Sequence, residues 1–345
     1  MKLFACQACG QLLYFENTRC EHCHRTLGYL PDLGTLSSLE PRSGGGWKVL
    51  ATPESTYKFC DNARYGVCNW MLPGSDPGGY CAACRHNRVI PDLSVPGNAL
   101  LWARIEDAKH RLFYSLILLR LLLANRNDDL AHGLVFDFLA DPPAAHVMTG
   151  HNNGVITLAL KEADGVVREQ VREAMGEPYR TLLGHLRHES GHYFWDRLVA
   201  ADTETLAAFR NLFGDERMDY AAALKAHYAQ GAPPNWQTDF LSAYATAHPF
   251  EDFAECWAHY LHIIDTLETA RAFDMTVATR KTTTRIAFDP YRAADMAQLI
   301  DAWLPVAFTV NSLNRSMGQP DLYPFILGPG AIAKLGFIHT LVHRG

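Results

Sequence analysis

The five residues His188-Glu189-Ser190-Gly191-His192 form a pattern that can hold a metal ion and activate a water molecule beside it. Four residues advance an α-helix by about 400°, so the two histidines lie on one face, one turn apart. Both imidazoles then reach one zinc ion at about 2.0–2.1 Å, while Glu189 reaches the bound water. Zinc lowers the pKa of that water toward about 7, so Glu189 can take its proton during attack on a carbonyl.

A catalytic zinc keeps three protein ligands and one open position, so the chain must supply a third ligand. No histidine follows His192 at the metzincin spacing. The best candidates are Glu251 and Glu255, one helical turn apart in a later segment. Either carboxylate could bind the metal while the other orients a ligating histidine. Asp196 lies one turn beyond His192, where its carboxylate could orient a ligating histidine without binding the metal.

The first cysteines form two C-x2-C pairs with ten residues between the pairs. These cysteines are Cys6, Cys9, Cys20 and Cys23. Each pair suits a tight turn that directs two thiolates at one ion, and two such turns complete a closed tetrahedral site. The spacing therefore predicts a structural zinc, with iron in the same cage or free thiols as the alternatives.

A second group of four cysteines is less regular, because it contains only one C-x2-C pair. Its members are Cys60, Cys68, Cys81 and Cys84. We expect a second structural zinc here, although ligand pairs could also be exchanged between the two sites. Three histidines lie close enough in the sequence to replace a thiolate: His22, His24 and His86.

The composition disfavours nucleic-acid and membrane functions. The chain has 345 residues, of which 31 are basic and 37 acidic. Residues 1–95 contain nine basic and eight acidic side chains, and two four-thiolate zinc sites would add negative charge, so nucleic-acid binding is disfavoured. The longest apolar run, residues 112–123, contains Arg120 and is too short to span a bilayer. No secretory signal opens the sequence, so we expect a cytoplasmic protein.

Eight of the nine cysteines lie before residue 85, and this change in composition divides the chain. We expect a first zinc ribbon at residues 1–33, a linker and a second zinc-binding module at 34–98, and a catalytic domain at 99–345. Hydrophobic periodicity predicts helices at 101–123, 166–175, 178–199 and 252–267, and strands at 134–138 and 154–160. Beyond residue 199 the pattern is almost wholly helical.

An H-E-x-x-H motif followed by E-x-x-x-D/E on a later helix resembles the glutamate-type zincins, such as thermolysin. The segment from Tyr244 to Glu255 also resembles the end of the catalytic domain of anthrax lethal factor, where a tyrosine stands seven residues before the ligand glutamate. This resemblance implies that Glu251 binds the metal, that Tyr244 donates a hydrogen bond in the transition state, and that Glu255 orients a ligand. It also implies a zincin-like α+β domain, mostly α-helical with a small edge sheet, preceded by small zinc-ribbon modules.

Over nearly its whole length the chain resembles a bacterial family of zinc-binding metallopeptidases with an N-terminal zinc-ribbon region. The segments that carry this resemblance are residues 27–32, 136–141, 179–185 and 258–262. The activity of that family is inferred from its motif, so the resemblance implies a mechanism and no particular substrate.

We therefore expect a zinc-dependent peptidase that hydrolyses peptide or isopeptide bonds and holds three zinc ions, one catalytic and two structural. Its partner would be a peptide or protein substrate, and the ribbons would serve either as a scaffold or as modules that dock the substrate or a protein partner. The alternative is a zinc-stabilised interaction module in which turnover does not matter. The presence of Glu189 and Tyr244 disfavours this alternative. These residues contribute little to metal binding, so a protein that no longer catalyses a reaction would not need to retain them.

Overall fold

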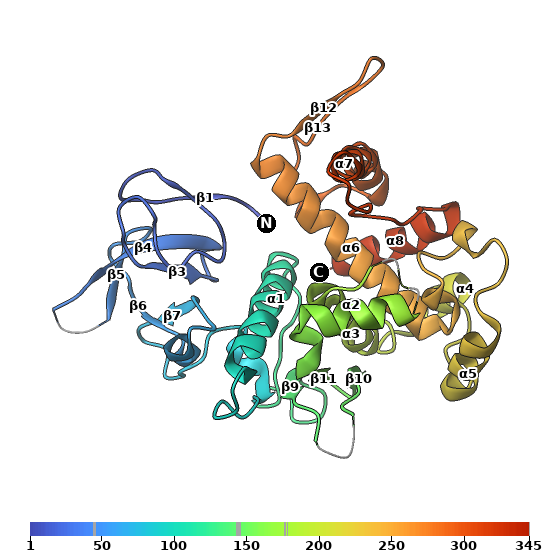
Figure 1. The fold of residues 1–345 in the computed structure, drawn as a ribbon, viewed down its shortest axis with the longest axis horizontal. Helices are drawn as coiled ribbons and strands as arrows, with labels where there is room; N and C mark the ends of the chain where they lie inside the picture. The colour runs from blue at the N-terminus through green and yellow to red at the C-terminus, as the bar shows by residue number, and fades with distance from the viewer. Residues whose placement is uncertain (44–45, 143–145, 176, 178, 345) are drawn as a thin grey trace. The chain divides into compact units, whose positions relative to one another are not determined.

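The computed structural model describes residues 1–43, 46–142, 146–175, 177 and 179–344 (Figure 1). The chain divides into two compact units, residues 1–168 and 169–345, which are described separately below. The boundaries predicted at residues 33 and 98 both fall inside the first unit. Among the described residues, no helix combines the length and the apolar character needed to cross a membrane.

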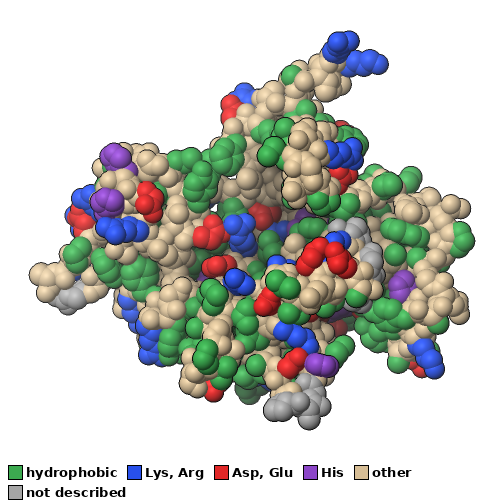
Figure 2. Space-filling view, viewed as in Figure 1, with side chains coloured by type: hydrophobic (Ala, Val, Ile, Leu, Met, Phe, Trp, Pro, Cys, Tyr) green, Lys and Arg blue, Asp and Glu red, His purple; other side chains and the backbone are tan. Residues whose placement is uncertain are grey.

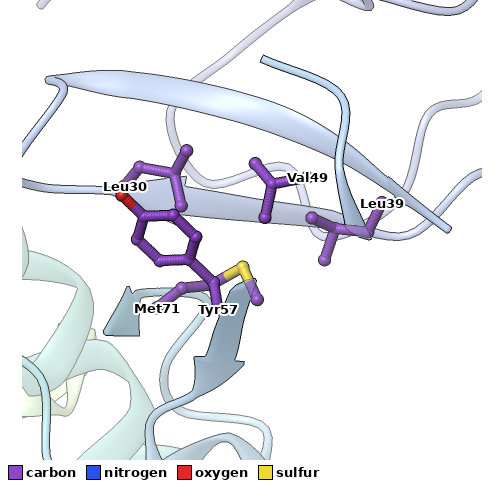
Figure 3. Close-up of a cluster of buried hydrophobic side chains, with 5 residues drawn as sticks. All are labelled: Leu30, Leu39, Val49, Tyr57 and Met71. Carbon is purple, nitrogen blue, oxygen red and sulfur yellow. The ribbon is translucent and has the colours of Figure 1, made fainter. Parts of the chain in front are cut away.

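The first unit begins with a region built from antiparallel strands, called the ribbon region below after the zinc ribbons that the sequence predicts here. A short hairpin pairs β1 (Phe4–Ala5) with β2 (Leu12–Leu13). A five-stranded antiparallel sheet follows, in the order β3 (Leu27–Leu30), β4 (Thr35–Pro41), β5 (Trp47–Val49), β6 (Thr56–Phe59) and β7 (Met71–Pro73). Its strands bury one apolar cluster, drawn in Figure 3, which consists of Leu30, Leu39, Val49, Tyr57 and Met71. Each of the five strands contributes one residue to this cluster, which therefore packs the strands of the sheet together.

The rest of the first unit places one long helix against a mixed sheet. The helix is α1 (Asn98–Leu118), and the sheet has the order β10 (Gly150–Asn152), β11 (Val155–Ala159), β9 (Val135–Leu139) and β8 (Asn87–Val89). Phe113 of α1 contacts the rings of His86 and Phe136, which joins the helix to the sheet. The predicted strands are confirmed, but α1 ends five residues before the predicted end, because Arg120 adopts a positive φ of 57°.

The second unit is mainly helical. Its helices are α2 (Gly165–Met175, which begins in the first unit), α3 (Leu182–Leu198), α4 (Thr203–Phe213), α5 (Tyr220–Gln230), α6 (Pro249–Ala272), α7 (Met296–Ser316) and α8 (Pro329–Val342). Helix α3 starts at Leu182, because the Thr181 side chain accepts a hydrogen bond from the amide of Gly184 and caps it. Pro178, which the sequence places in the first turn of this helix, lies outside the described residues.

Short 3₁₀ turns complete the fold, at η1 (Asp61–Tyr65), η2 (Cys84–His86), η3 (Leu160–Ala163), η4 (Trp236–Thr238), η5 (Tyr244–Thr246) and η6 (Pro290–Arg292). The sequence predicts an almost wholly helical chain beyond residue 199, and the described residues there contain one short hairpin besides the helices. Strands β12 (Thr276–Ala278) and β13 (Thr283–Arg285) form a hairpin, whose β-branched threonines favour extended backbone. Figure 2 shows basic side chains at the tip of this hairpin, where the sequence contains Arg280 and Lys281.

Helices α3 and α6 pack together more extensively than any other pair of described elements, and Gly191 makes their close approach possible. A Cβ atom at this position would lie 2.9 Å from the Cα atom of Ala254 on α6. Beside this contact the Trp257 indole donates a hydrogen bond to the Ser190 hydroxyl, and the rings of Phe194 and Trp257 stack. The H-E-x-x-H motif on α3 therefore packs closely against the helix that carries the candidate third ligand.

Candidate metal centre

The two histidines of the motif lie one turn apart on α3, and their ring centroids are 5.0 Å from one another. Both rings face the first turn of α6. This turn begins at Pro249, and the His248 side chain accepts a hydrogen bond from the Phe250 amide to cap it. The cap places Glu251 in the first helical turn, where its side chain is buried.

Glu251 completes a set of three donors. Its Oε2 atom lies 3.0 Å from Nε2 of His188, and its Oε1 atom lies 3.7 Å from Nε2 of His192. The ligand atoms of the three residues all lie within 4.8 Å of one another. A tetrahedral zinc with bonds of about 2.0–2.1 Å separates neighbouring nitrogen and oxygen ligands by about 3.3 Å. The donor set therefore fits one zinc ion with an open fourth position.

Glu255 contacts the other ring nitrogen of His188. The Nδ1 atom of His188 lies 2.8 Å from Oε1 of Glu255, so Nδ1 donates to the carboxylate and Nε2 is free to face Glu251 and a metal. Burial acts to raise the pKa of Glu255, but the His188 contact outweighs it and lowers that pKa to about 2. For Glu251, contacts with His188 and His192 likewise outweigh burial and hold its pKa well below the ordinary value. Both carboxylates therefore stay ionised.

Two tyrosines face the same carboxylate. Tyr244, in η5, has its ring centroid 6.1 Å from that of His188. Burial and then the charge of Glu251 raise the pKa of the Tyr244 phenol, which keeps it protonated as a donor. Tyr220, at the start of α5, donates a hydrogen bond of 2.6 Å to Oε1 of Glu251. Tyr220 could not be predicted from the sequence, because it belongs to no motif and reaches the site only through the tertiary fold.

The remaining predicted residues lie on the same helix as the histidines. Glu189 follows His188 directly, and its negative charge contributes to raising the pKa of Tyr220, after burial and the larger effects of Glu251. Glu189 therefore lies close enough to Tyr220 for the two side chains to interact electrostatically. Asp196 is exposed one turn beyond His192, and its support of a ligand stays a prediction.

The first cysteine group converges in the ribbon region. Its sulfur atoms lie within 4.8 Å of one another, with 3.5 Å between Cys6 and Cys23 and 3.7 Å between Cys9 and Cys20. Zinc–sulfur bonds of about 2.3 Å in a tetrahedron give sulfur separations of about 3.8 Å. The hydroxyl of Ser38 lies 3.0 Å from the Cys6 sulfur. The four thiols thus fit one closed tetrahedral site.

The second cysteine group also converges, with 3.8 Å between the sulfurs of Cys68 and Cys81. Each site takes its four cysteines from one continuous group, so ligand pairs are not exchanged between them. Of the nearby histidines that the sequence suggested, His86 instead lies with Nδ1 2.7 Å from the Leu134 carbonyl oxygen. The histidine at this site is His110 of α1, whose Nε2 atom lies 3.3 Å from the Cys68 sulfur.

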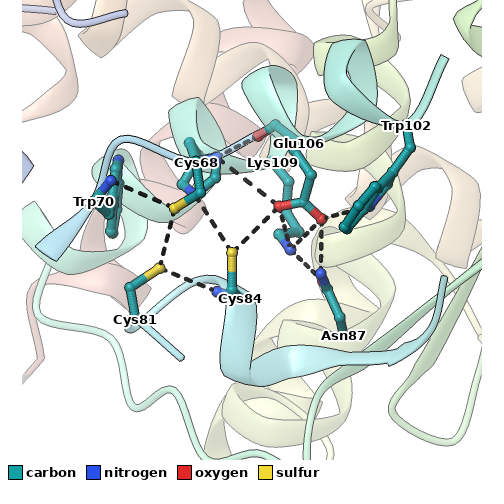
Figure 4. Close-up of polar contacts among 9 residues, drawn as sticks. Cys68, Trp70, Cys81, Cys84, Asn87, Trp102, Glu106 and Lys109 are labelled. Carbon is teal, nitrogen blue, oxygen red and sulfur yellow. Dashed lines mark hydrogen bonds and ion pairs between the residues drawn. The ribbon is translucent and has the colours of Figure 1, made fainter. Parts of the chain in front are cut away.

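Helix α1 places a buried polar layer beside this second site (Figure 4). The Cys84 sulfur lies 3.6 Å from the carboxylate of Glu106, which forms an ion pair of 2.9 Å with the ammonium of Lys109. The Trp102 indole and the Asn87 amide also donate to Glu106. Cys84, Glu106 and His110 are all buried, so the helix and the cysteine site exclude water together.

Comparison with known proteins gives matches to two family models. Residues 98–341 match a family described as "Putative zinc-binding metallo-peptidase", and residues 3–95 match a zinc-ribbon domain family. Similar proteins include uncharacterized proteins of Mycobacterium bovis and of two strains of Mycobacterium tuberculosis. Each is 44% identical over 344 residues, which covers 99% of this chain and 95% of the relative. No solved structure matches the chain.

Proposed function

Because the chain belongs to this family of zinc-binding metallopeptidases and carries an N-terminal zinc-ribbon region, we propose that it hydrolyses peptide or isopeptide bonds as an H-E-x-x-H peptidase. The observation that carries this proposal is the convergence of His188, His192 and Glu251 around one point, with Glu189 beside them. Three protein donors with an open position are typical of catalytic zinc sites, whereas structural sites are closed by four.

The residues around the donors have separate roles in the proposed reaction. When bound, the zinc ion supplies Lewis acidity, which polarises a carbonyl and lowers the pKa of water. Glu189 takes a proton from the attacking water and passes it to the amine that leaves when the C–N bond breaks. Tyr244 donates a hydrogen bond to the oxygen on which negative charge develops. Glu255 holds the His188 ring in the orientation that metal binding needs.

The two cysteine sites have a structural role in this proposal. Four thiolates leave no open position for a substrate, and the second site is enclosed by α1. The ribbon region then serves as a scaffold, or docks a protein partner or substrate, in a cytoplasmic protein. Nucleic acid is not proposed as a partner, because residues 1–95 are nearly neutral.

The proposal is tested with Glu189→Gln, which removes the base and keeps the ligands. We expect proteome-wide cleavage profiling to find peptide termini that the wild-type protein produces and the variant does not. Zinc content and unfolding temperature of the variant should equal those of the wild type. Identical cleavage by both proteins would refute the mechanism, and loss of zinc in the variant would show that Glu189 is a ligand.

A further inference from the structure

Helix α5, labelled in Figure 1, contacts the candidate ligand Glu251 through Tyr220, although none of its residues is fully buried. The Asp219 side chain caps its start and Gly231 follows its end. Because no side chain of α5 is fully buried, the hydrophobic effect contributes less to holding this helix in place than it does for a helix with a buried apolar face. Contacts made by particular side chains therefore matter more for its position.

The strongest of these contacts joins the first residue of α5 to the candidate metal ligand. The Tyr220 hydroxyl donates its 2.6 Å hydrogen bond to Oε1 of Glu251, and the Tyr220 ring lies 5.2 Å from that of His248, the cap of α6. A second contact lies further along the helix, where Nδ1 of His227 is 3.2 Å from the Thr246 hydroxyl of η5. Both contacts connect α5 to the segments that carry Tyr244 and Glu251.

The contact with Tyr220 gives the two carboxylate oxygens of Glu251 different partners. Oε1 accepts the phenolic hydrogen bond and lies 3.7 Å from Nε2 of His192, whereas Oε2 lies closer to a candidate ligand, 3.0 Å from Nε2 of His188. A hydrogen bond to one oxygen of a ligating carboxylate fixes its rotation, and such outer contacts tune metal affinity. A hydrogen bond to a carboxylate is also stronger than one between neutral groups.

We propose that Tyr220 is a positioning residue that holds Glu251 as a one-oxygen zinc ligand and thereby joins α5 to the metal centre. This inference rests on the proposed function, because it takes His188, His192 and Glu251 as the ligands of a catalytic zinc. It assigns a role to a residue outside the H-E-x-x-H motif and outside the Tyr244–Glu251 pattern.

The test compares Tyr220→Phe with Tyr228→Phe in the full-length protein. Tyr228 lies on the same helix and is 62% exposed, so its substitution controls for the loss of a tyrosine hydroxyl from α5. A competition titration with a calibrated chelator measures the affinity of the weakest zinc site in each variant. We expect about a 10-fold or greater loss of affinity for Tyr220→Phe and no change for Tyr228→Phe. The visible spectrum of cobalt at this site should also change only in Tyr220→Phe.

Equal zinc affinity in both variants would overturn the inference. An unchanged affinity together with a lower kcat in Tyr220→Phe would also overturn it, because Tyr220 would then act on the substrate. Since affinity is measured without a substrate, this result is independent of peptidase activity. A His192→Ala variant separates the two hypotheses: if it retains all the zinc of the wild type, the proposed function fails as well.

Discussion

At the scale of single residues, His188 joins two carboxylates through its two ring nitrogens. Nε2 faces Glu251 and Nδ1 faces Glu255, and Glu251 is the carboxylate that also lies near Nε2 of His192. This geometry supports Glu251 as the ligand that the resemblance to lethal factor implies. The spacing of one helical turn could not separate the two carboxylates, because it places both on the same face of α6.

The two carboxylates should therefore differ in the effect of an isosteric substitution. We expect Glu251→Gln to abolish tight zinc binding at this site. Glu255→Gln should weaken affinity by about 10–100-fold, because it removes only the group that orients His188. A competition titration with a chelator measures both values. If Glu255→Gln empties the site and Glu251→Gln does not, the two assignments must be exchanged.

A second prediction at this scale concerns the substitution of Tyr244. Its phenol is buried near Glu251, which keeps it protonated, and it is no metal ligand in our assignment. Tyr244→Phe should keep the zinc content and lower kcat by about 100-fold or more, with a smaller effect on KM, because one donor to the developing oxyanion is lost. Steady-state kinetics on a substrate from the cleavage profile measure this effect. An unchanged kcat would remove Tyr244 from the mechanism.

At the scale of elements, the helices that carry the candidate site could be predicted from the sequence. A long helical repeat of apolar residues indicates directly which face of a helix is buried. The sequence did not predict the polar layer of α1. Glu106, Lys109 and His110 have the types and spacing of an ordinary exposed helix face, and only the fold shows that they are buried. The β12–β13 hairpin was missed for another reason, since its threonine-rich segment follows a long helix and carries no strong turn signal.

From the polar layer of α1 we expect one substitution, at Glu106, to lower the stability of the protein strongly. Glu106→Gln would leave the buried ammonium of Lys109 without its counter-charge, and we expect a loss of about 3–5 kcal/mol of stability. Asp107→Asn, on the exposed side of α1, is the matched control and should change stability by less than about 0.5 kcal/mol. Hydrogen exchange of the α1 amides measures both changes. Equal protection in the two variants would show that the ion pair does not stabilise the helix.

At the scale of the whole molecule, the three candidate metal sites are divided between the two compact units. Both cysteine sites lie in residues 1–168, and the donors His188, His192 and Glu251 lie in residues 169–345. The sequence placed the cysteine groups before residue 99 and the histidine motif after it, whereas the two compact units divide at residue 168. It could not predict that the second cysteine site is enclosed by α1, because that contact joins residues 26 to 42 positions apart.

This division predicts the order in which the metal ions leave. Purified protein should contain three zinc ions per chain, and a weak chelator should remove one first, because the open site has three ligands and no thiolate. Peptidase activity should fall when that first ion is removed, while hydrogen exchange in residues 1–95 stays unchanged.

The control is His192→Ala, which should contain two zinc ions from the start. A stoichiometry near one, or iron in the cysteine sites, would contradict the assignment. Loss of structure in the ribbons together with the first ion would show that the most weakly held metal is one of the structural ions.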